Sequence, residues 1–96
     1  MMTKRQLVQI YQGKNIEIDQ SSVEHIPNSD VWTYKRFTFN YWRDRIYAKF
    51  EGEEIGWWTY TVEKKFELEP TSSQNLGILE IAEKVYRSIE APYKIL

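Results

Sequence analysis

Aromatic and basic side chains are interleaved through the middle of the sequence, and their chemistry is that of binding. Indole, phenol and guanidinium groups combine a large contact area with polar edges, and they dominate the anchors of protein–protein interfaces. On a sheet surface the same groups can stack nucleic-acid bases and pair with phosphates. We predict a partner-binding surface on one sheet face. Its expected residues are Trp32, Tyr34, Arg36, Trp42, Arg45, Tyr47, Lys49 and Trp57.

Side chains suited to catalysis or to metal binding are scarce. His25 is the only histidine and cysteine is absent, which excludes histidine dyads, disulfides and thiolate metal sites. Acidic residues are numerous, but they flank an expected turn near Gly52 or lie on a solvated strand face, away from the buried pairs of glycoside or metal chemistry. The scattered glycines form no nucleotide-binding motif. We therefore predict that the protein is not an enzyme and has no cofactor and no metal.

Length and charge narrow the class of protein further. A chain of 96 residues suffices for one domain, residues 1–96, and the formal net charge of −1 argues against wholesale attraction to nucleic acid or anionic lipid. No stretch approaches the roughly 20 apolar residues of a membrane span, and the N-terminus lacks the apolar run of a signal peptide. We therefore expect a cytoplasmic protein with no membrane partner. Its size and composition also fit a phage or mobile-element protein, although no motif supports that origin.

The centre of the chain predicts an antiparallel β-meander. Apolar residues alternate with polar ones over 31–41, 45–51 and 55–69, which is the period of a strand with one buried face. Because a slip of one residue would invert the faces, the alternation also sets the register. On the outer face we expect Lys49 opposite Trp57, in cation–π geometry, and Arg36 opposite Glu51. The expected inward pairs are Tyr41–Ile46, Phe39–Ala48, Phe37–Phe50, Phe50–Gly56, Ala48–Trp58 and Ile46–Tyr60.

One helix is expected before the meander in the sequence and another after it. Thr3 and Gln6 have the spacing of a capping box, which predicts a helix over 4–12 that Gly13 ends. A strand ending in a turn at 12–15 is the competing interpretation of this segment. Thr71 and Gln74 repeat the spacing before an apolar stripe, which predicts a second helix over 73–90 as cover for the inner sheet face.

The remaining segments are a short strand expected over 15–19 and a loop expected over 20–30. The tripeptide Trp-Thr-Tyr occurs at 32–34 and at 58–60, and the expected register turns its two copies to opposite faces.

The predicted fold is therefore α+β: an antiparallel meander of three or four strands, a short N-terminal helix and a C-terminal helix packed on one face. The predicted function is a non-enzymatic binding module, a small protein-interaction or inhibitor protein that docks its partner on the aromatic and basic face. The alternatives are binding of single-stranded nucleic acid or RNA on that face, a homodimer or larger homo-oligomer, and a face covered by the chain's own N-terminal helix.

Overall fold

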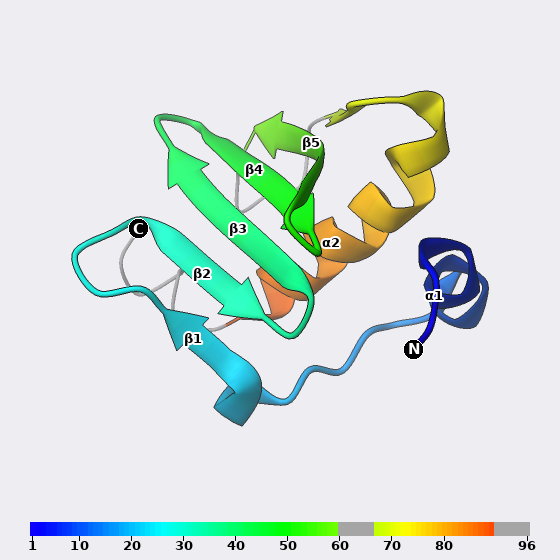
Figure 1. Cartoon of the computed structure of the whole chain (residues 1–96), viewed down its shortest axis with the longest axis horizontal. Coiled ribbons are helices and arrows are strands. Elements are labelled where there is room, and N and C mark those ends of the chain that lie inside the picture. The colour runs from blue at the N-terminus through cyan, green and yellow to red at the C-terminus, as the bar shows by residue number, and fades with distance from the viewer. Residues whose placement is uncertain (60–66, 90–96) are drawn as a thin grey trace.

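The computed structural model describes residues 1–59 and 67–89, which form an antiparallel sheet with helices on one side (Figure 1). The α-helices are α1 (Lys4–Tyr11) and α2 (Leu76–Ser88), and the 3₁₀ turns are η1 (Gln20–Ser22) and η2 (Ser73–Asn75). The strands are β1 (Val23–His25), β2 (Val31–Tyr34), β3 (Phe37–Trp42), β4 (Arg45–Phe50), β5 (Glu53–Thr59) and β6 (Leu68–Pro70). The predicted α+β class is confirmed.

The strands pair in the order of the sequence, so that each lies beside the next in one six-stranded antiparallel sheet. The predicted meander is right in type and wrong in size. Two expected strands are each two strands: 31–41 contains β2 and β3, and 55–69 contains β5 and β6, with residues 60–66 outside the described part. β1 lies in the expected loop over 20–30, whereas residues 15–19 form no strand and place Ile16 and Ile18 against the core.

The turn between β2 and β3 is the feature that the sequence interpretation missed. It consists of Lys35 and Arg36 alone, and Lys35 adopts the left-handed conformation with φ of 51°. A two-residue loop changes the phase of the alternation, because the flanking residues Tyr34 and Phe37 face each other and point to the same side. The inward residues of β2 therefore have even numbers, and those of β3 have odd numbers.

The inner sheet face packs against α2 and forms the core (Figure 1). Trp58 and Tyr86 are almost fully buried there, and their rings meet edge to face with centroids 6.1 Å apart. Phe39 packs against the same tyrosine with a centroid distance of 5.1 Å. Trp32 and Trp58 both belong to this core, so the two Trp-Thr-Tyr copies start on the same face and the predicted opposite orientation is wrong.

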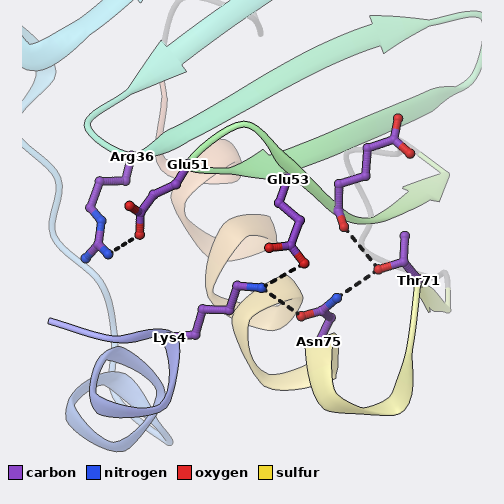
Figure 2. A network of polar contacts seen from close by, with 7 residues as sticks. Lys4, Arg36, Glu51, Glu53, Thr71 and Asn75 are labelled. Atoms are coloured by element: carbon purple, nitrogen blue, oxygen red, sulfur yellow. Dashed lines mark hydrogen bonds and ion pairs between the residues drawn. The ribbon is translucent and has the colours of Figure 1, made fainter.

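Helix α1 packs on α2 and leaves the outer sheet face open. The predicted capping box is present, since Thr3 and Gln6 exchange side-chain and backbone hydrogen bonds. Val8 lies so close to Gly77 of α2 that a side chain there would meet it at 3.1 Å. Lys4 Nζ then ties the helix to the sheet, at 3.3 Å from Glu53 Oε1 and 3.3 Å from Asn75 Oδ1 (Figure 2).

Thr71 joins this polar network instead of capping a helix. Its hydroxyl accepts a hydrogen bond from the Asn75 side-chain amide at 2.9 Å and donates to the Glu54 carbonyl oxygen at 3.1 Å (Figure 2). Neither η2 nor α2 has a side-chain cap, so the capping box predicted from Thr71 and Gln74 is wrong. The hydroxyl is held by the sheet and by Asn75, and the helical segment expected over 73–90 begins as η2 and continues as α2.

The pairing of β4 with β5 contains an irregularity that sets the faces of β5. A two-residue turn at Glu51 and Gly52, with φ of 52° and 81°, pairs Phe50 with Glu53. The register then shifts between Ala48 and Lys49, where one extra β5 residue, Ile55, is accommodated as a β-bulge.

This turn and bulge change the expected β4–β5 pairs. Ala48 pairs with Gly56 and Ile46 with Trp58, so the predicted Ala48–Trp58 pair is wrong by two residues, and so is the predicted Ile46–Tyr60 pair, whose Tyr60 lies outside the described residues. Phe50 pairs with Glu53 and not with the predicted Gly56, which lies three residues further along. The inward orientation of Trp58 is nevertheless confirmed. On the other side of β4, the predicted pairs Tyr41–Ile46, Phe39–Ala48 and Phe37–Phe50 are all confirmed.

Gly56 lies at this bulge, and we predict that it tolerates no side chain. Its φ is +145°, and a Cβ would meet Leu79 Cδ2 at 2.6 Å and Pro70 Cα at 2.8 Å. Gly56→Ala should lower the free energy of unfolding by about 3 kcal/mol, because strain and overpacking add. Urea unfolding measures the loss. Gly13→Ala is the control, since it has a left-handed φ of +71° with nothing within 4 Å, and it should cost only about 1 kcal/mol. Equal losses in the two variants would contradict this account of the bulge.

Asp19 should make the folded state sensitive to acid. The Ser21 hydroxyl and backbone amide and the Ser22 hydroxyl donate hydrogen bonds to the Asp19 carboxylate, and they lower its pKa. A carboxylate whose pKa is lowered by folding stabilises the protein above its unfolded-state pKa, and this contribution is lost as the pH falls through the folded-state pKa. Wild type should therefore lose more stability than Asp19→Asn between about pH 5 and about pH 2 in urea unfolding. Parallel stability curves for the two proteins would contradict the prediction.

Candidate functional site

The outer sheet face is the open face of the described structure. In Figure 1 α2 lies behind the sheet and α1 lies to one side of it, where it packs on α2, so that neither helix crosses the face turned to the viewer. Within residues 1–59 and 67–89, the alternative that α1 covers this face is therefore wrong. Five predicted site residues lie on it, and they come from the end of β3, from β4 and from β5. They are Trp42, Arg45, Tyr47, Lys49 and Trp57.

Aromatic rings and guanidinium groups form a continuous cluster on this face. The Arg45 guanidinium carbon lies 4.1 Å from the centre of the Trp57 ring, and the Tyr47 ring lies on the neighbouring strand with a centroid distance of 6.3 Å to Trp57. At the β3–β4 turn, the Arg43 guanidinium carbon lies 4.4 Å from the Trp42 ring centre. We call Trp42, Arg43, Arg45, Tyr47 and Trp57 the aromatic–arginine cluster. Such stacked pairs hold each arginine by its flat face and leave its N–H edges for a partner.

Trp42 is the most accessible member of the cluster. Trp42 is 53% exposed, more than any other aromatic residue in the described part of the chain. It is the last residue of β3, beside the turn at 43–44. Together with Arg43, Asp44 and Arg45 it lines a shallow hollow of about 180 Å³. A large apolar ring held in solvent beside two cations is a feature that interfaces use as an anchor.

Arg43 was missing from the predicted site because the sequence interpretation placed it only in a turn. The turn holds Arg43 in the left-handed conformation, with φ of 59°, and this brings its side chain back over Trp42. The signal in the sequence was the run Trp42-Arg43-Asp44-Arg45, in which two arginines flank the tip of a hairpin beside an indole.

Lys49 has a different environment from the one predicted. Because of the bulge, its partner on β5 is Glu54, and the residue opposite Trp57 is Tyr47. The predicted cation–π pair of Lys49 with Trp57 is therefore wrong, and Arg45 makes that interaction instead. Lys49 remains exposed on the open face, at its border with acidic residues.

Two predicted site residues belong to the core and not to the surface. Trp32 and Tyr34 are both only 7% exposed, and they pair with Phe39 and Phe37 on the inner face. The turn at 35–36 inverts their orientation relative to a continuous strand. They therefore leave the candidate site.

Arg36 also leaves the outer face. It lies in the β2–β3 turn with its guanidinium carbon 4.5 Å from the Phe50 ring centre, on the inner side of the sheet. Its Nη2 forms the predicted ion pair with Glu51 (Figure 2). The ion pair is confirmed, but the predicted location of Arg36 on the binding surface is wrong.

Other chemistry finds little support in the described residues. His25 is exposed and stacks on Trp32 with a centroid distance of 4.3 Å, while its Nε2 lies 2.5 Å from the Ser29 carbonyl oxygen. In residues 1–59 and 67–89, no three or more histidine, cysteine or acidic side chains come together as metal ligands would. No α-helix in this part of the chain combines the length and the apolar character that crossing a membrane requires.

The open face carries both signs of charge. Arg43, Arg45 and Lys49 are its cations, and Arg45 Nε lies 3.9 Å from Asp44 Oδ1. Glu54 and Glu69 are the register partners of Lys49 and Trp57 on the neighbouring strands.

Comparison with protein-family models, with curated protein sequences and with solved structures gives no match. The geometry of the face is therefore the basis for assigning a role.

Truncation of the neighbours Trp57 and Trp58 should lower the unfolding free energy to very different extents. Trp58 is fully buried between Phe39 and Tyr86, and Trp58→Ala should cost about 3–5 kcal/mol of unfolding free energy. Trp57 packs on the surface under Arg45, and Trp57→Ala should cost about 1 kcal/mol. Urea unfolding followed by circular dichroism measures both. A larger loss for Trp57→Ala than for Trp58→Ala would show that the faces of β5 are assigned the wrong way round.

Proposed function

We propose that this protein is a non-enzymatic binding module that docks a protein partner on the aromatic–arginine cluster. The observation that carries the proposal is Trp42. This residue is 53% exposed, stacks with the Arg43 guanidinium, and lies on a face that no described helix covers. Trp and Arg are the residues most enriched among interface hot spots, and a buried partner contact would remove the indole from water.

The charges of the face favour a protein over a nucleic acid. Cations at Arg43, Arg45 and Lys49 alternate with carboxylates at Asp44 and Glu54, so a phosphate backbone would meet repulsion as well as attraction. The formal net charge of −1 provides no compensating long-range attraction. A mixed-charge protein surface can instead be complementary to such a pattern.

A face-to-face homodimer is less favoured by the same geometry. A two-fold axis through the cluster would place Arg43 and Arg45 of one copy near those of the other, and like charges at an interface are unfavourable. The edge strands of the described sheet are also poorly suited to pairing with a second copy of the chain, because β1 and β6 have three residues each and β6 ends in Pro70.

The test is affinity capture from extracts of the cells that produce the protein, with mass spectrometry as the readout. Wild type should retain a protein that Trp42→Ala and Arg45→Ala recover at least tenfold less. Ile10→Ala is the matched control, because Ile10 is 43% exposed on α1, away from the open face, and its variant should retain the partner. Circular dichroism checks that every variant is folded.

Two outcomes would contradict the proposal. In the first, wild type and both cluster variants retain the same proteins, which would show that binding does not depend on the aromatic–arginine cluster. Quenching of tryptophan emission by a single-stranded oligonucleotide at about 50 mM salt, reversed at higher salt and lost in Trp42→Ala, would assign the face to nucleic acid instead.

A further inference from the structure

A recess on the helix side of the sheet is built differently from the open face. Its volume is about 200 Å³, and it lies between α1, the segment at 16–17, the β2–β3 turn and α2. Its walls are mainly apolar, and those used in the argument are Leu7, Tyr34, Phe37, Phe50, Ile81 and Val85. A cavity of roughly 150 Å³ with walls of this kind can hold a benzene ring. The recess therefore has room for one small ring or a short branched chain.

Arg36 is one of the residues that line this recess, and its side chain has a hydrogen-bond donor without an acceptor. Its Nη2 is paired with Glu51 (Figure 2). Its guanidinium carbon lies 4.5 Å from the centre of the Phe50 ring. Its Nε is buried, and no hydrogen-bond acceptor among residues 1–59 and 67–89 reaches it. A buried N–H without an acceptor is unfavourable, and an acceptor atom supplied by a ligand would remove that penalty.

Lys35 adds a second positive charge at the mouth. It is exposed, adopts the left-handed φ of 51°, and places its ammonium 5.4 Å from the Tyr34 ring centre. Among the lining residues in the described part of the chain, the only acid is Glu17, which is exposed. Residues held in the left-handed conformation without being glycine are often found at ligand-binding positions. Apolar walls with two cations at one end match a ligand with an apolar body and one anionic oxygen pair.

We infer that this recess binds a small-molecule carboxylate whose apolar part is about the size of a benzene ring. One carboxylate oxygen accepts the Arg36 Nε–H, and Lys35 compensates the charge at the mouth, while the ring lies against Phe37 and Val85. A phosphate fits less well, because it needs more donors than this wall offers. The site is independent of the aromatic–arginine cluster, which lies across the sheet.

Benzoate is the probe, and the readout is the ¹H–¹⁵N spectrum of the labelled full-length chain at pH 7. Titration should shift the Arg36 Nε–H resonance together with the amide resonances of Phe37 and Val85, along one saturating curve. Benzamide is the matched neutral probe, since it has the same ring and shape without the charge. It should bind at least fivefold more weakly.

The variants separate this site from general anion binding. Arg36→Gln and Lys35→Gln should weaken benzoate binding at least tenfold and threefold, respectively. Arg43→Gln, on the other face, should leave it unchanged. If Arg36→Gln does not fold, Lys35→Gln and the comparison of benzoate with benzamide still decide the question.

Three results would overturn the inference. One is the absence of shifts at the recess up to about 20 mM benzoate, where the standard binding free energy would be only about −2 kcal/mol. Another is equal binding of benzamide and benzoate. The third is a loss of binding in Arg43→Gln as large as that in Lys35→Gln, which would place the probe on the aromatic–arginine cluster.

Discussion

The bulge between β4 and β5 determines which side chains the protein buries and which it presents to solvent. The tight turn at 51–52 by itself would continue a pairing that directs Trp57 inward and Trp58 outward. The extra residue Ile55 reverses this, so that Trp58 enters the core and Trp57 lies under Arg45 on the open face. Gly56 makes the bulge compatible with its neighbours, because the backbone of β6 and the Leu79 side chain of α2 lie too close to it for a side chain. The core and the candidate binding surface therefore depend on the same irregularity.

The two candidate sites have a common construction. Each lies beside a two-residue turn whose first residue is a cation in the left-handed conformation, Lys35 in one and Arg43 in the other. This conformation costs an L-residue about 1–2 kcal/mol relative to the right-handed region, so glycine or asparagine would be the easier choice for folding alone. In both turns an arginine also stacks on an aromatic ring, Arg36 on Phe50 and Arg43 on Trp42. The turns thus place charge next to apolar surface, on opposite sides of one sheet.

Much of the fold could be predicted from the sequence, because alternation reports faces reliably where strands are continuous. The register of β3 with β4 was predicted correctly from residues such as Phe39 and Ala48. The turn at 35–36 was missed because it contains no glycine, proline or asparagine. Its signal was a change of phase, with the aromatic residues Trp32 and Tyr34 at even positions before it and with aromatic residues at odd positions over 37–41. The β4–β5 register was missed, because the turn at 51–52 and the extra residue Ile55 shift the pairing of Ala48 by two residues, and alternation cannot distinguish registers that differ by two.

The sequential order of the sheet has a consequence for how the chain is made. Every described strand pairs with the next described strand in the sequence, so the sheet can assemble from local hairpins, a topology associated with rapid folding. The element that shields the inner face is α2, which is synthesised after all six described strands, and α1 rests on α2. During translation the apolar side of the sheet therefore emerges from the ribosome before its cover exists. For that interval the nascent chain resembles an aggregation-prone intermediate, and α2 both completes the core and ends this exposure.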